Sequence, residues 1–418
     1  MTIWLVIAAL LAINMAWSMG ANDVANAMGT AIGSRVLTLG QALAIAGSLE
    51  FAGAVLLSQR VVRRLATSIT NTEQFAAQPQ TLLLGMIAVL LASGLWLQLA
   101  TRWGLPVSST HAIVGAIAGF SLVAVGPSSL NWPALGQLAL AWVLTPVFGG
   151  LLAAAVYGAL RQGILRQADP WRYWQESCPW LAVLVIGVFG AGIAPQLGEL
   201  KTGLSIALPS QTLLLLVGFV GVIVLTVLGL RPVAPELAVP ESAPPSLEIQ
   251  LGRFQIVSSS FVAFAHGAND VGNAIAPFAV VVAIVGSGAV PTTDLPVPFW
   301  LLLAGGVAII LGLAIQGQNV ITTIGEDITP LQPSSGFCAE LATAATVLLA
   351  TSLGFPVSTS HALVGSLWGI RLMNRETSGG TEVLGKIVSA WALTVPIALV
   401  LGALSYWGLA NLAELGWF

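Results

Sequence analysis

The amino-acid sequence predicts an all-α polytopic membrane protein, made of two inverted-topology repeats with broken or re-entrant helices. Three observations predict this fold class. Of the 418 residues, 56% are hydrophobic and only 7% are charged, with a mean hydropathy of +0.91, whereas soluble domains carry about 25% charged residues. Apolar runs long enough to cross about 30 Å of hydrocarbon recur along the chain. Two polar motifs each occur twice, in the same order.

The apolar runs read as helices, because stretches such as Thr81–Ala100 are continuously apolar, whereas a barrel strand alternates over about ten residues. The first run lacks a basic leader and continues into a polar motif, so we expect a first transmembrane helix rather than a cleaved signal. We expect about 10 to 12 transmembrane segments, some of them half-helices. The predicted segments are residues 2–20, 38–58, 80–101, 108–126, 133–160, 179–197, 208–230, 254–286, 297–316, 338–353, 360–373 and 385–410.

The repeated motifs divide the chain into two homologous halves. "GANDVANA" begins at Gly20 and "GANDVGNA" at Gly267, an offset of 247 positions. "GLPVSSTHAIVG" begins at Gly104 and "GFPVSTSHALVG" at Gly354, an offset of 250 positions. We therefore expect a first transmembrane half at residues 1–230, a Pro/Glu-rich cytoplasmic linker at 231–253 and a second transmembrane half at 254–418.

The orientation of the halves follows from the number of crossings. Seven predicted crossings separate the two aspartate motifs, and an odd number inverts the second copy. Arginines follow the fifth segment and flank the linker, so both loops are expected in the cytoplasm and the N-terminus outside. "RVVRR" (residues 60–64) then lies on the opposite side unless it belongs to a re-entrant element, which leaves the topology of 60–78 and 316–337 open. Inverted repeats indicate an alternating-access transporter with its site near the bilayer midplane.

Each aspartate motif places a carboxylate and two amides in apolar surroundings. A charged side chain in hydrocarbon costs at least about 2.5 kcal/mol, Asn and Asp are poor helix formers, and a glycine precedes each motif. We therefore expect a helix interruption, whose freed carbonyls join the side chains as oxygen ligands for Na⁺, or a proton on the aspartate. The alternative is that these groups only hydrogen-bond helices together. The candidate cation-binding residues are Asn22, Asp23, Asn26, Asn269, Asp270 and Asn273, with Na⁺ possible at Asp23, Asn26, Asp270 and Asn273.

Each serine and threonine motif predicts a helix start. Pro106 and Pro356 precede three adjacent hydroxyl residues, and Pro followed by Ser or Thr is typical of a helix N-terminus. Unpaired N–H groups and the positive end of the helix dipole bind anions there. The alternative is ordinary capping. The candidate anion-binding residues are Ser108, Ser109, Thr110, Ser358, Thr359 and Ser360.

Four further residues are secondary candidates: the glutamates Glu50 and Glu340, which interrupt apolar segments, and the histidines His111 and His361, which follow the hydroxyl motifs. A structural role in the core is at least as good an interpretation of the two histidines. His266 precedes the second aspartate motif where Met19 precedes the first, so we interpret it as structural.

An oxyanion bound beside two carboxylates would be repelled by their negative charges. One pair of negative charges at 6 Å costs about 3 kcal/mol even at an effective dielectric constant near 20, and no lysine or arginine lies in the matched motifs. Cations at the aspartates would remove this cost, so anion and cation are expected to bind with positive coupling, which is the basis of symport.

The chain resembles the inorganic phosphate transporter (PiT) family. The resemblance rests on "GANDVANAMGTAIGSRVLTLGQA", "GLPVSSTHAIVG", "AHGANDVGNAIAPF", "ITTIGEDITPLQPSSGFCAELATA" and "GFPVSTSHALVG", and spans nearly the whole chain. It implies a secondary transporter in the plasma (inner) membrane that imports inorganic phosphate with Na⁺ or H⁺, often as a homodimer, with no other cofactor. It also implies sites at the motif residues and functional roles for Glu50 and Glu340.

Arg35 stands where the family commonly has glycine, which leaves a sulfate permease of the same fold as the nearest alternative. An anion channel is a further alternative, although a channel needs no cation ligands. A membrane enzyme would need an activated nucleophile or a metal cluster, and the sequence predicts neither. Nothing in the charge balance of −3 indicates a nucleic-acid partner.

Overall fold

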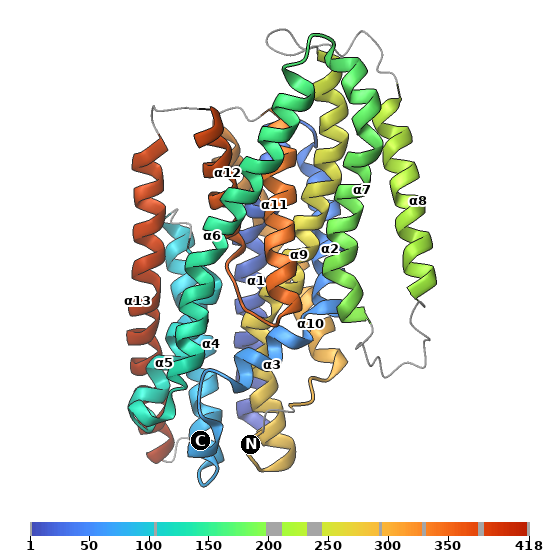
Figure 1. Ribbon diagram of the computed structural model, residues 1–418. Helices are drawn as coiled ribbons and strands as arrows, with labels where there is room; N and C mark the ends of the chain where they lie inside the picture. The colour runs from blue at the N-terminus through green and yellow to red at the C-terminus, as the bar shows by residue number, and fades with distance from the viewer. Residues whose placement is uncertain are drawn as a thin grey trace.

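The structure, a computed structural model, describes residues 2–103, 107–197, 211–231, 245–291, 295–327, 332–374 and 380–415. Over these ranges the chain is helical, and no strand longer than the isolated bridge between Thr70 and Leu130 is present. This confirms the predicted all-α class. The long helices lie side by side along one axis, and the first turn of α1 and the last turn of α13 lie at the same end of the bundle (Figure 1).

The helices of the first half are α1 (Thr2–Gly33), α2 (Leu39–Leu57), α3 (Gln59–Thr67), α4 (Pro79–Arg102), α5 (Ser109–Ala124), α6 (Trp132–Leu160), α7 (Pro170–Leu197) and α8 (Gln211–Leu230). Three single turns, η1 (Thr72–Phe75), η2 (Pro127–Ser129) and η3 (Arg161–Leu165), join them. The helices of the second half are α9 (Pro245–Ser287), α10 (Phe299–Asp327), α11 (Pro333–Ser352), α12 (Thr359–Asn374) and α13 (Gly380–Glu414).

Local sequence explains where several of these helices begin. Thr38 forms a capping box with Gln41 ahead of α2, and the side chain of Asn131 accepts from the backbone N–H of Ala134 at the start of α6. A proline occupies the first turn of α4 and α11, where its missing N–H costs nothing.

Nine helices in the described part of the chain are long and apolar enough to cross a membrane, and two further apolar helices are shorter. The helices differ in where they lie: 83% of the apolar window of α11 and 72% of that of α9 are buried, against 17% in α7. The exposed face of α8 carries large apolar residues such as Leu215 and Phe219. The helices α9, α11 and α4, the last with 78% of its window buried, therefore lie mostly inside the protein, and the outer helices present an apolar surface suited to lipid.

The helices α5 and α12 have 16 residues each, about 24 Å at 1.5 Å per residue, and are too short to cross the hydrocarbon. Each follows a longer helix that it packs against, α4 and α11 respectively. Their starts at Ser109 and Thr359 are buried inside the protein. The expectation that some segments are half-helices holds for this pair.

The predicted interruption at the aspartate motifs is wrong, because α1 and α9 run unbroken through them. The glycines that suggested a break serve close packing instead. A Cβ atom at Gly20 would collide with the backbone of Ile309, and one at Gly267 with the backbone of Glu50. The backbone stays helical, so the ligands available at the motifs are side-chain atoms.

The close contacts are reciprocal between the halves. Gly53 of α2 packs against the backbone of Phe264 on α9, while Gly312 of α10 packs against the backbone of Trp17 on α1. Phe264 and Trp17 are themselves related by the 247-residue offset of the aspartate motifs. In Figure 1, α1 rises from the end that carries both termini, and α9 descends toward it.

The predicted linker boundary differs from the structure, and two segments whose topology was left open are now described in part. The helix α9 begins at Pro245, so residues 245–253 of the predicted linker are helical, with Leu247 and Leu251 buried against the bundle. Residues 60–78 form α3 and the turn η1, and residues 316–337 contain the end of α10 and the start of α11. Pro106 lies outside the described residues.

Candidate functional site

The two hydroxyl motifs cap the half-helices, as predicted. The backbone N–H of His111 donates to Ser108 Oγ at 3.2 Å, and that of His361 donates to Ser358 Oγ at 3.3 Å. Both capping serines are buried, so the unpaired backbone N–H groups of these helix starts lie inside the protein rather than in water. The two positive helix ends therefore point into the interior, where an anion would be shielded from water.

Amides of the aspartate motifs reach across to the hydroxyls of the opposite half. Asn26 Nδ2 donates to Ser360 Oγ at 2.9 Å. Asn273 Nδ2 lies 3.2 Å from Ser109 Oγ and 3.3 Å from Thr110 Oγ1. The polar motifs of both halves thus meet at one buried junction.

The two aspartates lie at this junction. Asn26 Nδ2 also donates to Asp23 Oδ1 at 3.0 Å, and Thr359 Oγ1 donates to Asp270 Oδ2 at 3.3 Å. Asp23 and Asp270 are 3% and 2% exposed. Two buried oxygens here, Asp270 Oδ1 and Asn273 Oδ1, accept no hydrogen bond from any residue that the structure describes. Buried acceptors are nearly always satisfied, so these atoms are suited to a bound cation or water.

His266 is a functional candidate that the sequence interpretation missed. Its Nε2 lies 3.0 Å from Asp270 Oδ2 and 3.6 Å from Asp23 Oδ2, and its Nδ1 lies 3.2 Å from Glu50 Oε1. One nitrogen atom of His266 and one carboxylate oxygen from each aspartate lie within 4.8 Å of one another. The sequence interpretation of His266 as structural did not anticipate this position beside three carboxylates. Its spacing four residues before Asp270 on one helix was the available signal.

This histidine makes the junction asymmetric. Glu50 packs on Gly267 as Ile309 packs on Gly20, and His266 precedes Gly267 as Met19 precedes Gly20. The polar pair of Glu50 and His266 in one half thus corresponds to the apolar pair of Ile309 and Met19 in the other. Both members of the polar pair are fully buried. Removing such a pair from water carries a desolvation penalty that can exceed the attraction between its members.

Glu340 belongs to a separate buried network. It accepts hydrogen bonds from Thr30, from Ser258 Oγ at 2.7 Å and from Gln255 Nε2 at 3.4 Å. Thr30 lies about two turns beyond Asp23 on α1. The structure therefore joins Glu50 to the central junction through His266, but places Glu340 toward the end of α1, away from the aspartates.

The side chains of His111 and His361 pack on each other and on tryptophans. Their ring centroids are 4.6 Å apart, with Trp142 at 4.0 Å from His111 and Trp391 at 3.6 Å from His361. Each Nδ1 atom faces a backbone carbonyl of the opposite tryptophan, Trp391 O at 3.4 Å and Trp142 O at 3.5 Å. This arrangement favours the core interpretation for both histidines.

Asn22 and Asn269 hold neighbouring elements in place. Asn269 Nδ2 donates to Phe355 O at 3.0 Å, and its Oδ1 accepts from Val357 N at 3.1 Å, so it fixes the segment that leads into α12. Asn22 Nδ2 donates to Asp23 Oδ1 at 3.3 Å, and its Oδ1 accepts from Thr101 at 3.4 Å. These contacts favour a positioning role for Asn22 and Asn269 over direct cation ligation.

Arg35 lies away from the junction, exposed in the turn between α1 and α2. Its φ of 60° is in the left-handed region, which glycine adopts without cost. A backbone requirement therefore accounts for a glycine at this position, and the arginine side chain does not contact the anion-binding candidates.

An all-helical, multi-pass fold with a buried polar junction between its two halves defines an integral membrane transport protein. Residues 19–402 match the profile of the phosphate transporter family (PHO4). The chain belongs to this family, which confirms the resemblance noted from the motifs. Its relatives are transporters and not enzymes.

Individual relatives cover nearly the whole chain. A putative phosphate permease of Thermococcus kodakarensis is 37% identical over 406 residues, covering 96% of both chains. Inorganic phosphate transporter 2-1, chloroplastic, of Arabidopsis thaliana is 36% identical over 94% of this chain and 70% of its own length. The solved structure described as the sodium-dependent phosphate transporter is similar with a TM-score of 0.88 and 36% identity, covering 98% of this chain and all 100% of that one.

Proposed function

We propose that the chain is a secondary active symporter that imports inorganic phosphate together with Na⁺ by alternating access. One observation carries the proposal: amides beside the aspartates of each half hydrogen-bond to the hydroxyls of the opposite half, at 2.9 Å for Asn26 with Ser360 and 3.2 Å for Asn273 with Ser109. A cation at the aspartates and an anion at the two helix starts would then be neighbours. Each would offset the charge of the other.

The cation would bind between Asp23 and Asp270. Their carboxylates come from different halves, and Asp270 Oδ1 and Asn273 Oδ1 remain available as ligands. Oxygen ligands suit a hard cation such as Na⁺. The name of the structural neighbour, a sodium-dependent phosphate transporter, supports Na⁺ over H⁺.

The anion would bind at the starts of α5 and α12. Ser109, Thr110, Thr359 and Ser360 offer hydroxyls beside the positive helix ends. Thr359 donates to Asp270 at 3.3 Å, so an acceptor carboxylate adjoins the anion position. Phosphate at neutral pH usually keeps one proton, so its hydroxyl group can donate a hydrogen bond to this carboxylate. Sulfate has no such proton, so the carboxylate favours phosphate over sulfate.

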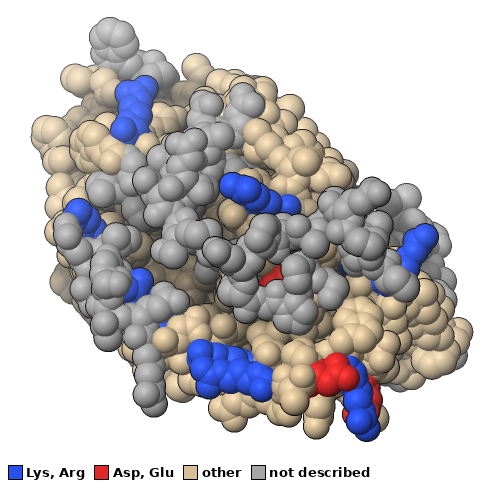
Figure 2. All heavy atoms as spheres, turned by 90° about the horizontal axis from the view of Figure 1, so that it is seen from above, with Lys and Arg blue, Asp and Glu red and all other residues tan. Residues whose placement is uncertain are grey.

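The charges of the loops support the orientation needed for import. The ends of α6, α8 and α12 and the start of α9 lie at the upper end of Figure 1. Figure 2 shows that lysine and arginine side chains outnumber acidic ones on the visible part of that face. By the positive-inside rule that face is cytoplasmic and the termini are outside. The opposite directions of α1 and α9 support the inverted repeat, and a homodimer in the plasma (inner) membrane remains our expectation.

Uptake of radiolabelled phosphate into proteoliposomes tests the proposal. We expect saturable uptake that an inward Na⁺ gradient drives and that excess sulfate does not inhibit. Uptake driven by a proton gradient alone would assign H⁺ as the coupling ion. Inhibition by equimolar sulfate would favour a sulfate permease, and non-saturable, gradient-independent flux would indicate an anion channel.

A further inference from the structure

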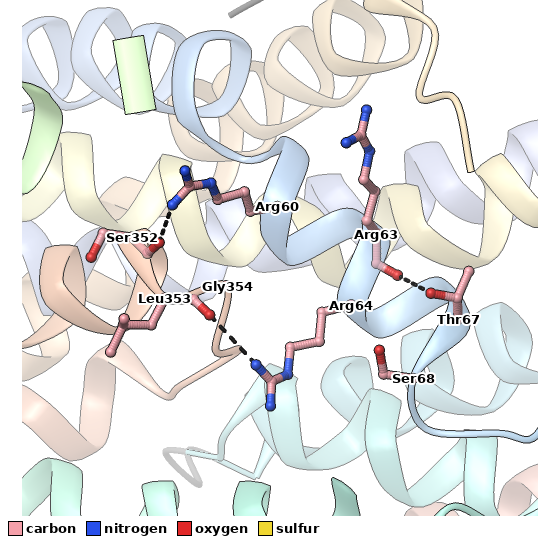
Figure 3. Close-up of a pocket in the computed structure, with 8 residues that line it drawn as sticks. All are labelled: Arg60, Arg63, Arg64, Thr67, Ser68, Ser352, Leu353 and Gly354. Carbon is pink, nitrogen blue, oxygen red and sulfur yellow. Dashed lines mark hydrogen bonds between the residues drawn. The ribbon is translucent and has the colours of Figure 1, made fainter. Parts of the chain in front are cut away.

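A basic pocket opens beside the segment that leads into α12. Its volume is about 410 Å³, and it is lined by Arg60, Arg63, Arg64, Thr67, Ser68, Ser352, Leu353 and Gly354. No aspartate or glutamate is among these lining residues. Figure 3 shows the three arginines extending from α3, with Arg60 and Arg64 reaching the chain turn from Ser352 to Gly354 and Arg63 extending away from that turn. The helix α3 lies toward the end of the bundle that carries both termini (Figure 1).

Two of the arginines are anchored to that turn. Arg60 donates to the carbonyl of Ser352, and Arg64 Nη1 lies 3.5 Å from the carbonyl of Leu353. The guanidinium of Arg64 also lies 3.7 Å from the ring centroid of Phe355. These contacts hold two permanent positive charges against the turn, because an arginine stays protonated at any physiological pH.

Arg63 differs from its neighbours. Its side chain is exposed, and no described residue forms an ion pair or a side-chain hydrogen bond with its guanidinium. The folded state does not require its charge for any contact in the described part of the chain. Its five N–H donors are therefore available to an anion in the pocket.

The helical pattern of α3 does not require arginines either. The second half of the chain repeats the segment "QRVVRR" (residues 59–64) as "QNVITT" (residues 318–323), 259 positions further on, which is also the offset between Gly53 and Gly312. The glutamine and the apolar positions correspond, whereas Asn319, Thr322 and Thr323 replace the three arginines. These three arginines are thus specific to the first half of the chain.

The pocket adjoins the candidate anion site. Gly354 in its wall is five positions before Thr359, where α12 begins. Phe355, beneath the Arg64 guanidinium, accepts the hydrogen bond from Asn269 in the aspartate motif of α9. The chain that forms the pocket wall therefore continues directly into the start of α12, the positive end of that helix.

We propose that this pocket is an outer binding site for a phosphate oxyanion, which collects free phosphate on the external side before it reaches the central junction. This inference rests on the proposed function. It also explains why three arginines lie on the side that the positive-inside rule leaves poor in positive charge. A surface of this sign raises the local concentration of an anion and its rate of association.

The test compares apparent KM values for phosphate in intact cells that lack other phosphate uptake. Removing one unit charge about 6 Å from an anion in water changes its affinity about threefold. We expect Arg63→Gln to raise the KM about threefold and Arg63→Glu about tenfold at 10 mM ionic strength, with the maximal rate unchanged. The effect should shrink at 150 mM, because the Debye length falls from about 30 Å to about 8 Å. Arg63→Lys should keep the wild-type KM.

Arg172→Gln is the matched control, since it removes an equal charge from a side chain whose only described ion pair, with Glu176, is exposed. Its KM should equal that of wild type. Equal KM values for wild type, Arg63→Gln and Arg63→Glu would overturn the inference. If wild type itself takes up no phosphate, the proposed function fails instead, so the two failures are distinguishable.

A lipid headgroup offers the same phosphate chemistry, and proteoliposomes separate the two sources. We expect Arg63→Gln to raise the KM in vesicles of phosphatidylcholine alone. A KM difference that appears only when phosphatidylglycerol is added would assign the pocket to an anionic lipid and overturn the role in phosphate collection.

Discussion

His266 Nδ1 lies 3.2 Å from Glu50 Oε1, and the corresponding residues of the other half, Met19 and Ile309, are apolar. The two halves are therefore alike in their helices and hydroxyl caps but unlike at this pair. Glu50 and His266 are both fully buried, so Glu50 depends on His266 for compensation, whereas His266 also lies 3.0 Å from Asp270.

Replacing only one member of this pair should destabilise the protein strongly. His266→Met leaves Glu50 uncompensated, and Glu50→Ile leaves His266 without that partner, each at a cost of about 3 kcal/mol or more. The double variant copies the apolar pair of the other half and should melt at a higher temperature than either single variant. Thermal unfolding of the detergent-solubilised protein measures this, and a strictly additive loss in the double variant would contradict the pairing.

Asp23→Asn and Asp270→Asn should each abolish Na⁺-driven phosphate uptake while the protein still folds. The amide keeps the size of the carboxylate but removes the charge that would bind the cation. Proteoliposome uptake measures the loss. Glu176→Gln, which alters an exposed carboxylate on α7, should transport normally. Wild-type rates in both aspartate variants would remove the aspartates from the mechanism.

Ser109→Ala and Thr359→Ala should raise the apparent KM for phosphate about tenfold. A hydrogen bond to a charged group contributes about 1.5 kcal/mol or more, which corresponds to at least a tenfold change in affinity. Ser48→Ala is the control, because Ser48 is exposed and its hydroxyl donates only to the carbonyl of Ala44 in its own helix. An unchanged KM would show that these hydroxyls do not contact the anion.

Gly267→Ala should lower the melting temperature and the amount of folded protein. The added Cβ would collide with the backbone of Glu50, which cannot move as a flexible side chain can. Gly187→Ala in α7 meets no atom within 4 Å and should be neutral or slightly stabilising, since alanine favours a helix by about 1 kcal/mol over glycine. Equal melting temperatures for the two variants would contradict the packing role of Gly267.

Arg35→Gly should leave the preference for phosphate over sulfate unchanged. Arg35 is exposed in the α1–α2 turn, and its φ of 60° is one that glycine adopts freely. The substitution relieves backbone strain of about 1 kcal/mol and removes no contact with the candidate anion site. Competition between labelled phosphate and sulfate measures the preference. A changed ratio of phosphate to sulfate uptake would show that Arg35 contributes to selectivity.

The sequence was informative where a structural feature depends on residues that are adjacent in the chain. The helix starts at the two hydroxyl motifs were predicted correctly, because proline, serine and threonine act on their own local backbone. The predicted break at Gly20 and Gly267 was wrong, because a glycine before a polar motif can either interrupt a helix or allow another helix to pack closely against it. Only the position of the neighbouring helix distinguishes a break from a close contact.

By itself, the sequence determined that the protein is helical, spans a membrane and carries the same polar motifs in both halves, because composition and short-range patterns control these properties. The tertiary structure alone decided that Asn26 meets Ser360, that His266 lies between Asp23, Asp270 and Glu50, and that Glu340 belongs to another network. These relationships join residues on separate helices, and the packing of those helices sets which buried polar atoms become partners.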